Sequence, residues 1–73
     1  MQYNNEKLLH LGQHIRSLRK RRKLTLEALC YKNGLEPSTI SRIEKGLVEP
    51  KYLTLLNIAE AYNIKISQLL DFD

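Results

Sequence analysis

The 73-residue sequence predicts an all-α fold, a compact bundle of five helices, on three observations. Apolar residues recur three and four positions apart in five segments, as in helices that bury one face. Cap and turn residues, among them Asn33-Gly34, Pro37 and Pro50, separate these segments. Only residues 63–68 alternate like a strand, and that stretch has no second strand with which to pair.

Length and composition indicate one small domain over residues 1–73. A hydrophobic content of 42% and a charged content of 27% are ordinary for a globular protein, so disorder is not expected. The single cysteine cannot form an internal disulfide, which fits a reducing compartment. No apolar run reaches the roughly 18 residues of a membrane span, and no signal-peptide pattern opens the chain. We therefore expect a cytoplasmic protein without membrane contact.

The first helix is expected at residues 6–22, with Asn4 or Asn5 as its N-cap. Its apolar stripe consists of Leu8, Leu11, Ile15 and Leu18. Thr25 is a suitable N-cap for a second helix at residues 26–32. The buried side of that helix is expected to hold Leu26 or Ala28, together with Leu29 and Cys30.

The remaining helices are expected at residues 37–45, 52–62 and 66–70. Pro37 suits a first helical turn, because its missing N–H leaves no hydrogen bond unmade there. Asn63 is a plausible left-handed residue at the end of the fourth helix. The apolar anchors of these helices are Ile40 and Ile43, then Leu55, Leu56, Ile58, Ala59 and Tyr62, then Ile66 and Leu69.

The net charge of +4 favours an anionic partner such as nucleic acid. Six basic residues fall within eight positions: Arg16, Arg19, Lys20, Arg21, Arg22 and Lys23. A run of this kind also occurs on a helix face that is simply solvated, so charge alone leaves both readings open.

The second and third expected helices are separated only by Asn33-Gly34-Leu35-Glu36. They must cross at a steep angle, because the glycine reverses the chain within about four residues. This arrangement is a helix-turn-helix, whose second helix places its N-terminal residues in the major groove of DNA. That groove, about 12 Å wide, admits a helix whose outward side chains are short or extend along base edges. The residues that meet this need are Ser38, Thr39, Ser41, Arg42 and Lys45.

Residues 11–70 resemble the Cro/CI, or Xre-type, helix-turn-helix family of phage and bacterial regulators. The most specific motifs are STISRIEKG at residues 38–46, Pro50 after it, and LLNIAEAYNIKISQLL at residues 55–70. The resemblance implies a compact five-helix domain, usually dimeric, that binds a roughly palindromic operator in double-stranded DNA and mostly represses transcription.

The resemblance also implies roles for residues at matching positions. Base contacts are expected from Pro37, Ser38, Ser41 and Arg42. Phosphate contacts are expected from Arg16, Lys20, Leu26, Thr39, Lys45 and Lys51, with Arg22 and Lys23 as further candidates. Two alternatives stay open: Arg42 contacts a phosphate instead of guanine, and the serines serve only to let the helix approach the bases.

Three residues depart from the family pattern. Leu26 stands where glutamine is common, and only its backbone N–H is suited to a phosphate. Pro37 offers the bases only an apolar contact, and Glu36 stands where serine or threonine usually caps the helix. These departures give weight to another class of function, a protein–protein adaptor that has lost DNA binding.

Other polar residues point to structure rather than chemistry. Arg19 and Glu44 match positions that form a semi-buried ion pair in the family, and Cys30 is expected to be a buried small hydrophobe. His10 and His14 have a metal-binding spacing, but no suitable third ligand is near in sequence, so a solvated face is the better hypothesis. We expect no metal, no cofactor and no enzyme activity.

The family's dimer surface generally involves the last two helices. The apolar residues in excess of what one small core covers are Leu53, Ile66, Leu70 and Phe72. They favour a homodimer that holds its two reading helices about 34 Å apart, although Phe72 folded over Leu69 is the monomeric alternative. A dimeric repressor is the main hypothesis. An antitoxin with a toxin or another protein as its partner, or a restriction–modification controller, is the alternative within DNA binding.

Overall fold

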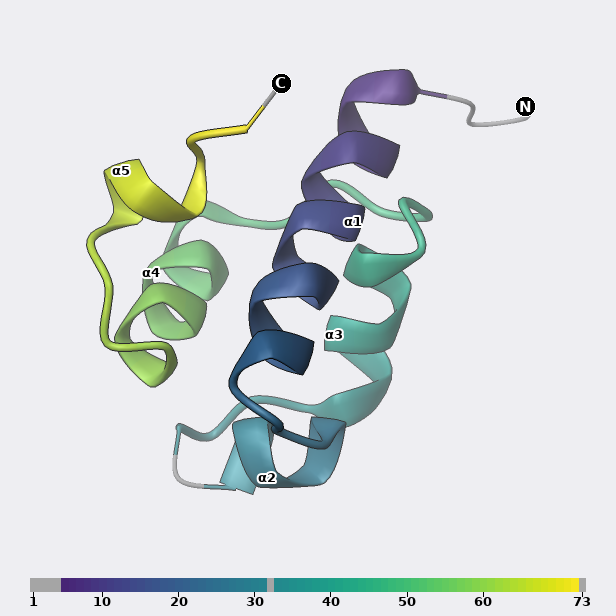
Figure 1. Ribbon diagram of the computed structural model, residues 1–73. Coiled ribbons are helices and arrows are strands. Elements are labelled where there is room, and N and C mark those ends of the chain that lie inside the picture. The colour runs from purple at the N-terminus through teal and green to yellow at the C-terminus, as the bar shows by residue number, and fades with distance from the viewer. Residues whose placement is uncertain (1–4, 32, 73) are drawn as a thin grey trace.

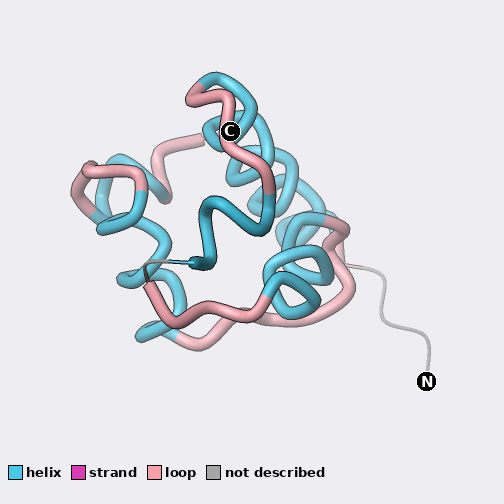
Figure 2. Tube along the Cα trace, turned by 90° about the horizontal axis from the view of Figure 1, so that it is seen from below, coloured by secondary structure: helices cyan, strands magenta, loops and turns pink. Residues whose placement is uncertain are grey.

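The computed structural model describes residues 5–31 and 33–72, and five helices lie in them. In chain order they are α1 (Glu6–Arg21), α2 (Leu26–Tyr31), α3 (Pro37–Glu44), α4 (Tyr52–Ala61) and α5 (Ile66–Leu69). The described residues contain helices and loops and no strand (Figure 2). The predicted all-α fold is confirmed. Asn4 and Lys32, expected as a cap and as a helix end, lie outside the described residues.

Helix α1 is the central element of the fold (Figure 1). Helix α3 packs along one side of it, α4 and α5 lie along the other side, and α2 lies below its C-terminal end (Figure 1). The core between them consists of Ile15, Leu29, Cys30, Ile40, Ile43, Ile58, Ala59, Tyr62 and Leu69. All five helices contribute to this core, so the position of α3 is fixed from several directions.

The helix ends follow from local chemistry. The side chain of Asn5 accepts a hydrogen bond from the backbone N–H of Lys7 at 2.8 Å, and that of Thr25 accepts one from Ala28 at 3.0 Å. Both predicted N-caps are therefore confirmed. Four helices end one residue before the predicted end, because that residue is a C-cap; Arg22, with φ −88° and ψ 1°, is an example. On α2, Leu26 is half-buried against the core, whereas Ala28 is exposed.

Left-handed backbone turns the chain between successive helices. Gly34 (φ 65°), Gly46 (φ 73°) and Asn63 (φ 58°) stand where the sequence predicts helix ends. Lys23 also has a positive φ, 56°, in the connection from α1 to α2. A lysine gives no turn signal, so the sequence did not predict this conformation.

Helices α1 and α3 approach each other at the level of their backbones. A Cβ atom placed on Gly12 would lie 2.5 Å from the carbonyl oxygen of Glu44 and would also meet the carbonyl oxygen of Ile43. Only a glycine fits this position of α1 without moving the end of α3.

A buried ion pair joins the same two helices. Arg19 Nε donates to Glu44 Oε2 at 2.8 Å, and Arg19 Nη2 donates to Glu44 Oε1 at 3.0 Å. A third donor, Nη1, binds the carbonyl oxygen of Leu24 at 2.8 Å. The bond with Glu44 raises the pKa of the Arg19 guanidinium, whereas burial opposes that shift. Arg19 therefore fixes α1, the end of α3 and the connection to α2 relative to one another.

Arg22 joins α1 to the end of α4. Its Nε donates to the carbonyl oxygen of Tyr62 at 3.2 Å, and its guanidinium carbon lies 5.2 Å from the centre of the Tyr62 ring. The hydroxyl of Tyr62 donates to the carbonyl oxygen of Ile15 at 3.1 Å, and burial raises the pKa of this phenol. Arg22 is half-buried in this cluster and has a structural role there, while its expected phosphate contact stays a prediction.

Candidate nucleic-acid interface

Helix α3 has one apolar face and one polar face. Ile40 and Ile43 are 0% and 2% exposed and hold the helix to the core. Its opposite side carries the exposed residues Pro37, Ser38, Thr39 and Arg42, followed by Lys45 at the C-cap, while Ser41 is half-buried. Proline, hydroxyls and cations thus project away from an aliphatic base. All four residues expected to contact bases lie on this polar side.

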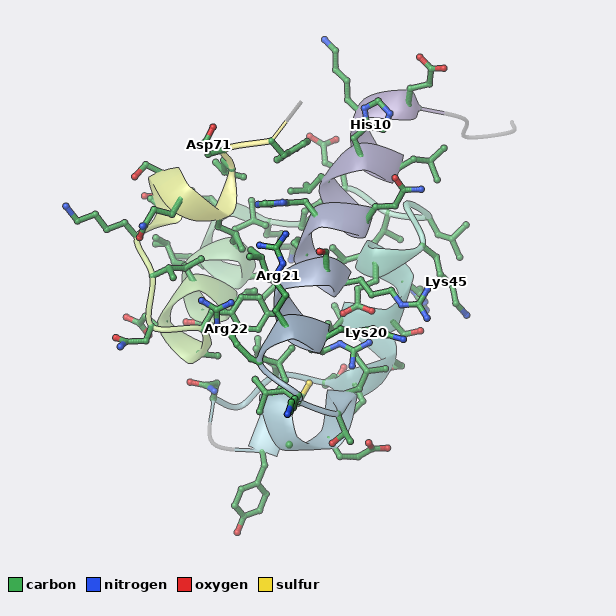
Figure 3. All side chains as sticks on the ribbon, viewed as in Figure 1. His10, Lys20, Arg21, Arg22, Lys45 and Asp71 are labelled. Carbon is green, nitrogen blue, oxygen red and sulfur yellow. The ribbon has the colours of Figure 1, made fainter. Side chains whose placement is uncertain are left out.

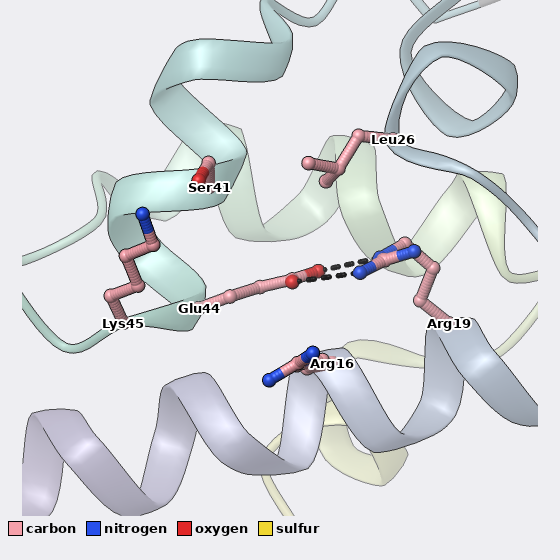
Figure 4. A pocket seen from close by; sticks show the side chains of 6 residues that line it. All are labelled: Arg16, Arg19, Leu26, Ser41, Glu44 and Lys45. Carbon is pink, nitrogen blue, oxygen red and sulfur yellow. Dashed lines mark hydrogen bonds and ion pairs between the residues drawn. The ribbon is translucent and has the colours of Figure 1, made fainter.

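A hollow of about 180 Å³ lies beside α3 (Figure 4). Its lining residues are Arg16, Arg19, Leu26, Ser41, Glu44 and Lys45. Arg19 is paired with Glu44, whereas Arg16 on α1 and Lys45 at the C-cap of α3 are both exposed. The structure therefore brings together four residues expected to contact DNA, Leu26 and Ser41 being the other two, although they come from three different helices.

A second hollow lies on the other flank of α3, against the connection to α4. Its lining residues are Thr39, Arg42, Ile43, Val48, Glu49, Pro50, Lys51 and Thr54. Lys51 precedes the first residue of α4, and Thr54 lies in its first turn. Thr54 was not singled out from the sequence, since a threonine inside an apolar helix segment is not a distinctive signal.

The cluster of cations is divided between two sides of the molecule (Figure 3). Lys20 projects on the same side of α1 as Lys45, toward α3, whereas Arg21 and Arg22 project toward α4. The charge run is therefore not one surface. Part of it flanks the polar face of α3, and part lies away from it.

Comparisons with known proteins agree with this geometry. A family model described as "Helix-turn-helix domain" matches residues 10–70, which is most of the chain. The chain belongs to this helix-turn-helix family, of the Cro/CI-like, Xre type. The named relatives are transcriptional regulators, a class of protein that is not an enzyme.

Two relatives and one solved structure illustrate the similarity. The transcriptional repressor RghR of Bacillus subtilis is 40% identical over 60 residues, which cover 81% of this chain and 44% of RghR. The immunity repressor of Bacillus phage phi105 is 37% identical over 60 residues, covering 82% of this chain and 42% of that repressor. The chain thus spans less than half the length of these relatives. The restriction–modification controller C.AhdI of Aeromonas hydrophila superposes with a TM-score of 0.85 at 29% identity, covering 89% of this chain and 98% of the controller.

The surface expected to form the dimer of this helix-turn-helix chain is only partly exposed. Leu53 and Leu70 are 69% and 44% exposed. Ile66 is half-buried and packs against the core. Phe72 is half-buried and stacks on His14, with ring centres 5.1 Å apart and an interplanar angle of 28°. The hypothesis of a solvated His14 is therefore wrong, because the C-terminal segment covers one face of its ring.

The thiol and the possible metal ligands of this helix-turn-helix domain give no sign of a reactive site among the described residues. Cys30 is 4% exposed, and burial raises the pKa of its thiol, which disfavours the reactive thiolate. Across residues 5–31 and 33–72, no three His, Cys, Asp or Glu side chains are grouped as metal ligands. Within the same ranges no helix is both long and apolar enough to cross a bilayer.

Proposed function

We propose that the chain is the DNA-binding unit of a transcriptional regulator, most simply a dimeric repressor, and that α3 enters the major groove. The observation that carries the proposal is the polar face of α3, which projects short hydroxyl side chains and cations from a buried aliphatic base. Such a helix can approach base edges without a steric clash. The family membership and the regulator names of the relatives support the same function.

Within this proposal, direct reading of bases is assigned to Pro37, Ser38, Ser41 and Arg42. Arg42 is the main specificity residue, because a guanidinium can donate two hydrogen bonds to O6 and N7 of guanine. The phosphate ligands proposed on one flank are Arg16, Lys20 and Lys45, together with the backbone N–H of Leu26. On the other flank Lys51 is the corresponding ligand. Both flanks of α3 would then be fixed to the sugar–phosphate backbone.

Selection of bound fragments from a random DNA pool tests the proposal, followed by affinity measurements at several salt concentrations. We expect an inverted repeat to be enriched, and the logarithm of affinity to fall by about 0.9 per phosphate contact for each tenfold rise in salt. An adaptor that has lost DNA binding would enrich no sequence. Its contacts with a protein partner would also lack this steep salt dependence.

Arg42→Ala tests the role of the main specificity residue. In this variant we expect the free-energy preference for one base pair in each half-site to fall by about 1–3 kcal/mol. Arg21→Ala is the matched control, because it removes the same charge from the α4 side of α1, away from α3 (Figure 3). If Arg42→Ala weakened binding equally on all sequences, Arg42 would be a phosphate ligand and not a base reader.

Dimer formation is proposed through the exposed apolar residues Leu53 and Leu70, with Ile66 and Phe72 beside them. A two-fold axis here would set two copies of α3 one turn of DNA apart, about 34 Å. We expect sedimentation to give a dimer for the parent chain and a monomer for Leu53→Lys. A parent chain that sediments as a monomer when bound to the full inverted repeat would overturn this part of the proposal.

A second candidate is the control of restriction–modification genes. It is favoured by the C.AhdI superposition, which covers 98% of that controller, whereas less than half of RghR is covered. Selection from genomic DNA of the source organism tests it. Enrichment upstream of a methyltransferase–endonuclease gene pair would support this candidate, and enrichment only at other promoters would exclude it.

A further inference from the structure

Glu36 is an acidic residue at the leading end of a helix proposed to enter DNA. It is the N-cap of α3, with φ −98° and ψ 127°, but its side chain makes no capping hydrogen bond. Its carboxylate is exposed and accepts a hydrogen bond from the hydroxyl of Thr39 instead, at 3.5 Å. Helix capping therefore does not explain a glutamate at this position.

The surface of DNA restricts what a carboxylate can contact. Phosphates repel it, and most groups at the base edges are hydrogen-bond acceptors. The donors in the major groove are the amino groups of cytosine (N4) and adenine (N6). In adenine the amino group lies beside the acceptor N7, which repels a carboxylate, whereas cytosine presents no second acceptor in the groove. Cytosine is therefore the base edge that suits Glu36.

A weak hydrogen bond from Thr39 favours one direction of the Glu36 carboxylate. A threonine hydroxyl has one O–H donor, and here Glu36 accepts it. That donor is then not available to a phosphate oxygen, so the phosphate contact expected of Thr39 competes with its contact to Glu36. The bond is also long, which leaves the carboxylate free to accept a stronger bond from a base amino group.

We propose that Glu36 is a specificity residue that accepts a hydrogen bond from N4 of a cytosine in each half-site, with Thr39 as its positioning residue. This inference rests on the proposed entry of α3 into the major groove. It also explains why a glutamate stands where serine or threonine usually caps the helix. The side chain does not cap the helix but reads one base pair.

Selection from a random DNA pool, carried out with three chains, tests the inference. The chains are the parent, Glu36→Gln, and Glu60→Gln as the control. Glu60 is an exposed residue of α4, on the other side of α1 from α3, and its replacement removes the same negative charge. A general gain in affinity caused by lower repulsion from DNA should therefore be similar in the two variants.

We expect the parent and Glu60→Gln to select cytosine at one position of each half-site. Glu36→Gln should lose that preference by roughly 5- to 150-fold and shift it toward adenine, because glutamine pairs with N6 and N7 of adenine. Thr39→Val should weaken the same preference, and Thr39→Ser should restore it. All variants should melt at the temperature of the parent, since each replaced side chain is exposed.

Three results would overturn the inference. If Glu36→Gln selects the same bases as the parent and differs only by a uniform gain in affinity, Glu36 acts by repulsion alone, while the proposed DNA-binding function stands. A parent motif without the cytosine has the same meaning. If the parent selects no sequence at all, the proposed function fails first, and the inference fails with it.

Discussion

The two faces of α3 lie about 10 Å apart, one helix diameter, but their residues have different roles. On the inner face, Ile40, Ile43 and Glu44 are almost completely buried, and each of them is held by neighbours from other helices. On the outer face, Ser38 and Arg42 are exposed. The inner residues determine where the helix lies, whereas the outer residues are free to determine what it binds. Substitutions on the inner side should therefore change stability, and those on the outer side should change recognition.

The largest effect is expected from breaking the buried ion pair on the inner side. Arg19→Met leaves the Glu44 carboxylate buried without its partner, which should lower the free energy of unfolding by about 3–5 kcal/mol. Urea denaturation measures this change. The matched control is Lys20→Met, which removes a cation from the neighbouring, exposed position and should change stability by less than about 0.5 kcal/mol.

The double variant Arg19→Met with Glu44→Leu tests whether the lost stability comes from the unpaired carboxylate of Glu44. Two apolar side chains leave no unpaired buried charge, so we expect most of the lost stability to return. Equal destabilisation by the single and double variants would contradict this account. It would mean that the bond from Arg19 to the carbonyl oxygen of Leu24, lost in both variants, carries the stabilisation.

A smaller effect is expected where α1 approaches α3. Gly12→Ala places a Cβ against backbone carbonyls that cannot rotate away, so the two helices must separate. We expect a loss of about 1–3 kcal/mol in the free energy of unfolding, even though alanine favours the helix more than glycine does. Thermal denaturation measures it, with Ser17→Ala on the exposed side of α1 as the control. An unchanged melting temperature for Gly12→Ala would mean that the helices move apart at no cost.

The features of the fold that could be predicted from sequence are those with a local signal in the chain. Most helices were predictable because an apolar period meets a local cap or turn residue at one end or both. Asn5 and Thr25 cap helix starts, while Gly34 and Asn63 occupy left-handed positions after helix ends. Lys23 adopts the same backbone conformation although lysine is no turn signal, and the hydrogen bonds from the N–H groups of Lys23 and Leu24 to the carbonyl oxygens of Lys20 and Arg19 close the turn there. The stacking of Phe72 on His14 was missed for a different reason, since these residues are 58 positions apart in the sequence and meet only in the folded chain.

The candidate site was predictable to a different degree. Residues on α3 share one short helix, so their common outward side follows from helical spacing alone. The grouping of Arg16 with Lys45 and Leu26 could be expected only from the family resemblance, because three helices bring them together. The basic run could not be divided from sequence, and only the structure separates Lys20 on the α3 side from Arg22 beside Tyr62.

The smallest effects are expected on the outer face and decide between the two readings of its serines. Ser38→Ala keeps the side chain small but removes the hydroxyl, and Ser38→Leu adds bulk as well. Neither should change the free energy of unfolding by more than about 0.5 kcal/mol, because the position is exposed. If the hydroxyl reads a base, alanine should weaken DNA binding by about 1 kcal/mol and relax the preference at one base pair.

If Ser38 serves only to let the helix approach, the alanine variant should bind the selected sequence as the parent does, and the leucine variant should lose binding to every sequence. Titrations of the selected and a scrambled duplex with each variant distinguish these outcomes. A loss of several kcal/mol in the free energy of unfolding of either variant would contradict this division of roles between the two faces of α3. The outer face would then also stabilise the fold, and a substitution there could not alter recognition without altering stability.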